Sequence, residues 1–212
     1  MLQRLLFATI PCLIFLAGQA PAQTSSSTPD VCTTSDPNTL EMTFEEFDSG
    51  ETGWRRWGDN GCERETAAII LGYRDHHAGR LDPSQIAALD WHAEQLHAGA
   101  GDYGFAIERM LLVQDQTAEP AEIEYIKATI AFLRSNREDL VAARERMAAI
   151  PEPANFRRAA DRYVATYNLP RPVWPMNIDV VDRLTACFGW SYKMAYQGCS
   201  AAPAQSGNDP RE

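Results

Sequence analysis

The feature that most constrains the fold of this chain is an apolar spacing of three and four residues, which runs from about residue 63 to residue 198. Such spacing places apolar side chains on one face of an α-helix. It predicts seven helices, near residues 63–78, 83–98, 102–114, 120–134, 136–150, 154–167 and 177–198. Only the segment 42–46, where apolar and polar side chains alternate, leaves the choice between helix and strand open. We therefore expect an all-α fold.

Start signals support several of these helices. Asp82 precedes Pro83, and Gln85 stands three residues after Asp82, which is the pattern of a capped helix with proline in its first turn. Ser135 and Glu138 have the spacing of a second capping box, so we expect Ser135 to begin the fifth helix. Asn177 is expected to cap one continuous last helix.

Two segments of the chain resemble the tetratricopeptide repeat. Residues 101–107, Gly-Asp-Tyr-Gly-Phe-Ala-Ile, are similar to the turn and second-helix start of that repeat. One repeat period of about 34 residues further on, residues 135–141 turn into a helix again. The resemblance implies two repeat units, 83–114 and 120–149, and close helix packing at Ala106. It also implies a right-handed stack of helical hairpins with a concave face that binds proteins or peptides.

A second resemblance concerns the segments 91–93 and 128–133, Trp-His-Ala and Ala-Thr-Ile-Ala-Phe-Leu. They are similar to segments of a group of exported bacterial proteins of unknown role. This resemblance implies no activity.

The first residues have the three parts of a secretory signal peptide. Arg4 precedes an apolar run, residues 5–17, and Ala20-Pro21-Ala22 supplies small residues for cleavage before Gln23. The apolar run is shorter than the roughly 20 residues that a membrane-spanning helix needs. We therefore expect a signal peptide over 1–22 and a periplasmic or secreted protein without a membrane span after cleavage; the alternative is an uncleaved anchor.

Composition divides the remainder into three parts. Residues 23–40 are rich in Ser, Thr and Pro and are expected to be a flexible leader. Residues 41–199 are expected to form the helical repeat domain, and residues 200–212 a disordered tail. The formal net charge is −10, and loss of Arg4 with the signal leaves −11. Such an acidic chain is a poor candidate for binding nucleic acid or anionic lipid, whereas it can bind a cationic partner.

Four cysteines remain after cleavage: Cys32, Cys62, Cys187 and Cys199. In an oxidising compartment they favour two disulfides. If the last helix is continuous, the Cα atoms of Cys187 and Cys199 lie about 18 Å apart, too far for a disulfide. We therefore expect crosswise pairing, with Cys62–Cys199 and Cys32–Cys187 preferred. A break at Gly189 would overturn this expectation.

Histidine and carboxylate residues suggest a metal site only weakly. All four histidines lie within residues 76–97, where Glu94 and His97 form Glu-x-x-His and Asp90 lies one turn earlier. No second Glu-x-x-His is present, and His92 and His97 project about 140° apart on a helix. We expect no metal, no cofactor and no catalytic residue.

The segment 50–61 is rich in glycine and tryptophan, with Arg55 and Arg56 between Trp54 and Trp57. Arginine and tryptophan stack well, so these residues could form a ligand platform. The alternative is an irregular cap that folds over the first long helix.

No catalytic motif stands out in the chain. We therefore expect an exported, non-catalytic helical-repeat protein that binds a protein or peptide partner in the cell envelope. The alternatives are a metal-dependent or other hydrolase within a helical fold, and a structural assembly factor. The oligomeric state is left open.

Overall fold

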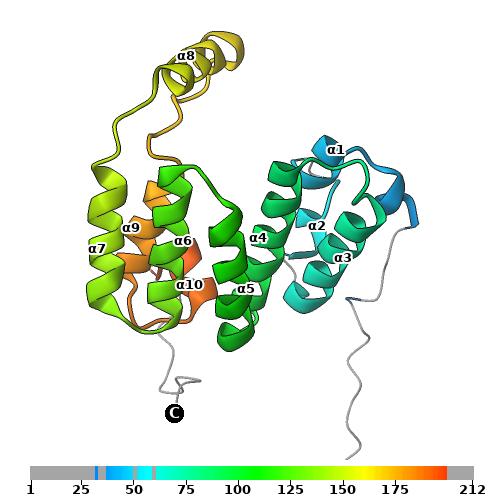
Figure 1. Cartoon of the computed structure of the whole chain (residues 1–212), viewed down its shortest axis with the longest axis horizontal. Helices are drawn as coiled ribbons and strands as arrows, with labels where there is room; N and C mark the ends of the chain where they lie inside the picture. The colour runs from blue at the N-terminus through cyan, green and yellow to red at the C-terminus, as the bar shows by residue number, and fades with distance from the viewer. Residues whose placement is uncertain (1–31, 33–36, 50–51, 59–60, 200–212) are drawn as a thin grey trace, which may run out of the picture. The chain divides into compact units, whose positions relative to one another are not determined.

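The structure is a computed structural model that describes residues 32, 37–49, 52–58 and 61–199. The described residues all belong to one compact unit, residues 31–212. They form a 3-10 helix and ten α-helices (Figure 1): η1 (Pro37–Glu41), α1 (Phe44–Asp48), α2 (Arg55–Gly58), α3 (Glu63–His76), α4 (Pro83–Gly99), α5 (Tyr103–Gln116), α6 (Pro120–Leu133), α7 (Arg137–Ala148), α8 (Ala154–Tyr167), α9 (Ile178–Ala186) and α10 (Tyr192–Gln197). No strand occurs within the described ranges, so the predicted all-α fold is confirmed.

Local capping explains where several helices begin. The Asp82 side chain accepts hydrogen bonds from the backbone of residues 84 and 85, which completes the predicted capping box of α4. Thr43 and Glu46 form another capping box, so the ambiguous segment 42–46 is the start of helix α1. The predicted box at Ser135 is wrong, because Ser135 has a left-handed backbone (φ 55°) and Asn136 caps α7 instead.

Helix α4 connects two hydrophobic cores. One face of α4 contributes Leu89 and Ala93 to a core formed with α1, α2 and α3. Another face contributes Trp91 and Ala98 to a larger core formed with α5, α6, α7, α9 and α10. The pairs α3–α4, α4–α5 and α6–α7 pack side by side, and α10 packs on α4 and α9 (Figure 1). This arrangement places α10, near the end of the described chain, beside helices near its start.

The predicted continuous last helix is wrong. Helix α9 ends at Ala186, Gly189 adopts a positive φ of 103°, and Ser191 caps the separate helix α10. The chain therefore turns back, which brings Cys187 and Cys199 to a Cα–Cα distance of 5.6 Å.

Each disulfide joins two cysteines that follow one another along the chain, Cys32 with Cys62 and Cys187 with Cys199. All four predicted cysteines are therefore paired, but the preferred crosswise connectivity is wrong. Its premise was the rigid helix that Gly189 interrupts.

The described helices begin inside the predicted leader 23–40. Helix η1 starts at Pro37, and Thr39 is buried. The Leu40 carbonyl oxygen lies at hydrogen-bond distance, 2.9 Å, from His77 Nε2. The predicted signal peptide 1–22 and tail 200–212 lie outside the described residues. None of the described helices is both long and apolar enough to cross a membrane.

Candidate functional site

A cavity of about 250 Å³ lies where α2, the start of α3, α4 and α10 meet. Its wall is formed by Trp54, Arg55, Gly58, Glu63, His92, Gln95, Leu96, Gly99, Tyr192, Lys193, Tyr196 and Gln197. We call this cavity the α2–α10 pocket. It combines three aromatic side chains with cationic and amide groups, a composition typical of binding sites.

The α2 side of the pocket holds a cation without a hydrogen-bonding partner at one of its nitrogens. The Arg55 guanidinium lies 4.2 Å from the centre of the Trp54 ring, and Trp54 Nε1 donates to Asp48 at 3.1 Å. Arg55 Nη1 is buried and has no hydrogen-bond acceptor among the described residues. A buried donor without an acceptor costs free energy, so this nitrogen is a natural place for an oxygen of a ligand.

The close approach of α2 to α4 depends on a glycine. A Cβ atom at Gly58 would lie only 3.3 Å from Leu96 Cδ2, which is closer than ordinary van der Waals contact. Gly58 thus allows the helix that carries Arg55 to lie against α4. A Cβ atom at position 58 would require the Leu96 side chain to shift by a few tenths of an ångström.

The α4 side of the pocket is held by side-chain hydrogen bonds. His92 Nε2 lies 3.3 Å from Asp48 Oδ1, and burial lowers the pKa of His92 despite this carboxylate and a hydrogen bond to Gln95. Gln95 Nε2 donates to the hydroxyl oxygens of Tyr125 at 2.9 Å and Tyr192 at 3.3 Å. These contacts tie α1, α4 and α10 together around the cavity.

The α10 side supplies Tyr192, Lys193 and Tyr196. Lys193 pairs with Glu63 across the pocket, and the rings of Tyr192 and Tyr196 lie 5.7 Å apart. The pocket wall thus carries the cations Arg55 and Lys193 against the single carboxylate of Glu63. This local excess of positive charge contrasts with the net charge of −10 of the whole chain.

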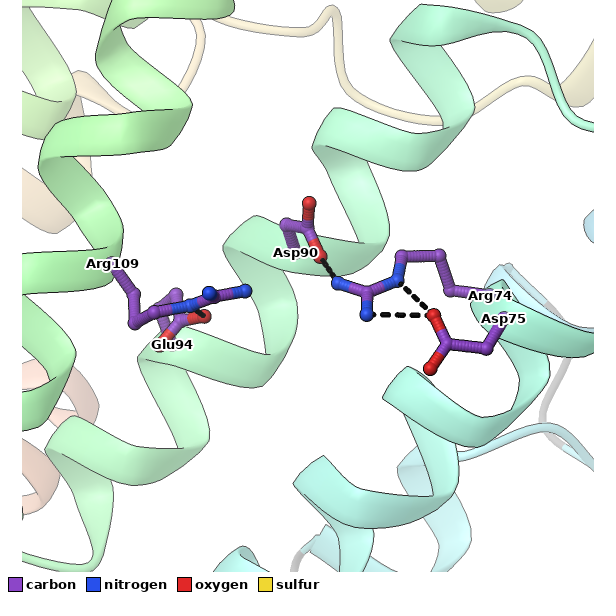
Figure 2. A network of polar contacts seen from close by, with 5 residues as sticks. All are labelled: Arg74, Asp75, Asp90, Glu94 and Arg109. Atoms are coloured by element: carbon purple, nitrogen blue, oxygen red, sulfur yellow. Dashed lines mark hydrogen bonds and ion pairs between the residues drawn. The ribbon is translucent and has the colours of Figure 1, made fainter. Parts of the chain in front are cut away.

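The Glu-x-x-His pair considered as a metal site is divided between different partners. Asp90 pairs with Arg74 of α3, which also pairs with Asp75, whereas Glu94 pairs with Arg109 of α5 (Figure 2). His97 Nδ1 lies 3.4 Å from Asp102. Within the described part of the chain, no three histidine, cysteine or acidic side chains are grouped to hold a metal ion.

Glu94 is the most perturbed carboxyl group of this network. Its side chain is fully buried, Oε1 lies 3.3 Å from Arg109 Nε, and Oε2 has no hydrogen-bond partner in the described residues (Figure 2). Burial raises the pKa of Glu94 to about 7, because the single contact with Arg109 offsets only part of the lost hydration. Glu94 lies outside the α2–α10 pocket wall.

The tryptophan-rich segment both covers the first core and lines the pocket. Trp54 is buried in the core with α3 and α4, and Trp57 packs against that core, as expected for a cap. Trp54 and Arg55 also line the pocket, so the ligand platform stays a prediction. Sequence reasoning missed Tyr192, Lys193 and Tyr196, because nothing in their local pattern indicates that α10 folds back onto α4.

Comparisons of the chain with known protein families, curated proteins and solved structures gave no match. The candidate site therefore rests on its own geometry.

Proposed function

We propose that this chain is an exported, non-catalytic binding protein whose α2–α10 pocket receives a carboxylate group of a peptide or protein partner. The observation that carries the proposal is the buried Arg55 Nη1, which lines the pocket and has no acceptor among the described residues. A guanidinium group pairs well with a carboxylate because two parallel N–H donors match its two oxygens.

The size of the cavity favours one chemical group over a whole ligand. Pockets that enclose drug-sized molecules measure roughly 300–1,000 Å³, whereas this cavity measures about 250 Å³. It therefore suits a side chain or a chain terminus. The rest of the partner would lie outside the pocket, which agrees with a protein or peptide as the partner.

The aromatic wall supports an apolar neighbour beside that carboxylate. The Trp54 ring lies under the Arg55 guanidinium, and α10 contributes Tyr192 and Tyr196 to the same pocket wall. A terminal or near-terminal aromatic or aliphatic side chain could pack between these rings. Aromatic residues together with arginine are common anchors at protein interfaces.

His92 has a positioning role in this proposal. Its ring is engaged by both Asp48 and Gln95, so it holds the α4 wall against α1. Binding, and not general-base catalysis, is the role that suits a ring with these two side-chain partners. The two disulfides support export, because such bonds persist in oxidising compartments.

The proposal is tested with short peptides of defined ends. Four acetylated tetrapeptides ending in Phe, Tyr, Leu or Glu, each as the free acid and as the amide, are titrated into the oxidised protein by calorimetry. We expect the acids to bind better than the amides. Arg55→Gln should weaken the binding of the acids about 10–100-fold, the range for loss of one charged hydrogen bond. Arg80→Gln, outside the pocket wall, is the matched control.

The arms of this experiment separate the sources of the carboxylate. Preference for the peptide acids identifies a chain terminus, whereas equal binding of the Glu-ending acid and amide identifies an acidic side chain. The proposal is wrong if none of the peptides binds at about millimolar concentration. It is also wrong if Arg55→Gln and Arg80→Gln change the affinity equally.

A further inference from the structure

Among the described residues that line the α2–α10 pocket, Glu63 is the only acidic one. Glu63 is 9% exposed, and its carboxylate pairs with Lys193, which α10 brings from 130 residues along the chain. The wall also carries Arg55, whose Nη1 is buried without an acceptor among the described residues. Arg55 and Lys193 are positive and Glu63 is negative, so these three side chains leave one positive charge uncompensated.

Local structure holds the Glu63 carboxylate at the pocket. Glu63 is the first residue of α3, and a negative charge is favourable in the first turn of a helix. A Cβ atom at Gly99 would lie 3.5 Å from Glu63 Cγ, so the aliphatic part of Glu63 lies against the backbone of α4. Together with the Lys193 ion pair, these contacts make the carboxylate a fixed part of the wall.

The histidine of the wall adds no charge at about pH 8. Burial lowers the pKa of His92 below its ordinary value of 6.5, although Asp48 acts in the opposite direction. Asp48 itself lies outside the pocket wall, where it accepts a hydrogen bond from Trp54 Nε1 and lies 3.3 Å from His92 Nε2. The charge of the wall therefore comes from Arg55, Lys193 and Glu63.

We propose that Glu63 determines the charge of the group that the pocket accepts, and that it selects a carboxylate over a phosphate. This inference rests on the proposed function, in which a carboxylate binds at Arg55. A carboxylate carries one negative charge, which the one uncompensated positive charge of the wall can neutralise. A phosphate monoester carries nearly two negative charges above its second pKa of about 6. Its second charge would be repelled by Glu63, and such repulsion is a common source of specificity.

The alternative is that Glu63 only holds Lys193, and with it α10, in place. The two roles predict opposite effects when the Glu63 charge is removed. Loss of a structural contact weakens the binding of every ligand, whereas loss of an opposing charge strengthens the binding of anions. Because Coulomb energy is proportional to the product of the charges, the gain in binding free energy should be about twice as large for a dianion as for a monoanion.

The test compares benzoate, phenyl phosphate and neutral benzamide, which share one ring and differ in charge. Each is titrated into the oxidised protein at about pH 8, where the phosphate is a dianion. Binding is followed by nuclear magnetic resonance, which detects the roughly millimolar affinities of such small molecules. We expect the parent protein to bind benzoate better than phenyl phosphate.

Glu63→Gln keeps the length and shape of the side chain and removes its charge. It should raise the affinity for benzoate about 3-fold and that for phenyl phosphate about 10-fold, the square of the first factor. The affinity for benzamide should stay unchanged. The double variant Glu63→Gln with Lys193→Gln leaves Arg55 as the one charge of the wall. It should therefore return the ratio of the two anion affinities to the parental value.

Glu65→Gln is the matched control, because Glu65 is an exposed acid in the same turn of α3 and lies outside the pocket wall. It should change none of the three affinities. Circular dichroism of each variant establishes that it is folded. The inference is overturned if Glu63→Gln lowers both anion affinities, leaves them unchanged or raises them by the same factor. The proposed function survives that result if Arg55→Gln still weakens the binding of benzoate.

Other outcomes separate the two ideas further. If the parent does not bind benzoate but Glu63→Gln binds phenyl phosphate, the carboxylate of the proposed function is wrong, whereas the role of Glu63 is supported. Both are wrong if neither anion binds to the parent or to Glu63→Gln at about 10 mM.

Discussion

Replacing Glu94 with Gln should remove a pH dependence of stability that the buried carboxyl group creates. Burial raises the pKa of Glu94 from 4.5 to about 7 in the folded protein. A group with a raised folded pKa stabilises the fold fully below its unfolded pKa, and this contribution is lost as pH rises through the folded pKa. Glu94 should therefore favour folding near pH 4.5 and lose that effect by about pH 7 to 8.

The size of this effect follows from the two pKa values. Their difference, at about 1.4 kcal/mol per pH unit, corresponds to about 3 kcal/mol of unfolding free energy. Glutamine keeps the shape of the side chain and does not titrate. Its amide nitrogen would have no hydrogen-bond partner, just as Oε2 has none in the parent protein. The change of unfolding free energy with pH is therefore more informative than its value at one pH.

The assay is urea unfolding followed by circular dichroism, at several pH values from 5 to 8. The unfolding free energy of the parent relative to Glu94→Gln should fall by about 2–3 kcal/mol across this range, since most of the titration lies within it. Glu145→Gln, on the exposed side of α7, is the matched control. Its unfolding free energy should change with pH in the same way as that of the parent. If Glu94→Gln also runs parallel to the parent, Glu94 is ionised in the folded protein and the reasoning from its burial fails.

Three further predictions concern the fold. Asp82→Ala should lower the unfolding free energy by about 1 kcal/mol, because it removes both backbone hydrogen bonds of the α4 cap; an unchanged urea midpoint would contradict this. Ala106→Phe should lower stability by about 1–3 kcal/mol or more through overpacking, since Ala106 is fully buried; calorimetric melting at the parental temperature would disprove it. Non-reducing peptide mapping should recover Cys187 bonded to Cys199, whereas a Cys187 fragment bonded elsewhere would exclude the turn at Gly189.

The helices that sequence predicts well are those with local signals. Asp82 and Pro83 indicate the start of α4, because an N-cap and a first-turn proline stabilise the helix end through residues that are close in sequence. The break at Gly189 is harder to predict, because Leu184, Phe188 and Ala195 continue a helical spacing across it. An apolar pattern therefore does not distinguish one long helix from two short ones.

The candidate site depends on contacts that local sequence does not encode. Lys193 meets Glu63 across 130 residues of chain, so α10 becomes a pocket wall only through tertiary packing. The different partners of Asp90 and Glu94, which their spacing had placed in one candidate metal site, have a related cause. Their partners, Arg74 and Arg109, come from neighbouring helices, and only the fold shows that each carboxylate already has a cation.

The short range of the two disulfides has a consequence for the pocket. Neither Cys32–Cys62 nor Cys187–Cys199 joins the first helices to the last, so no covalent bond crosses between the α2 and α10 walls. The α10 wall is held instead by its packing on α4, by the hydrogen bond between Gln95 and Tyr192, and by the Lys193–Glu63 ion pair with α3. A ligand that contacts both walls would stabilise their contact, and this stabilisation would grow with the ligand concentration. The stability of the contact between the first and last helices would then depend on ligand concentration and not on the disulfides.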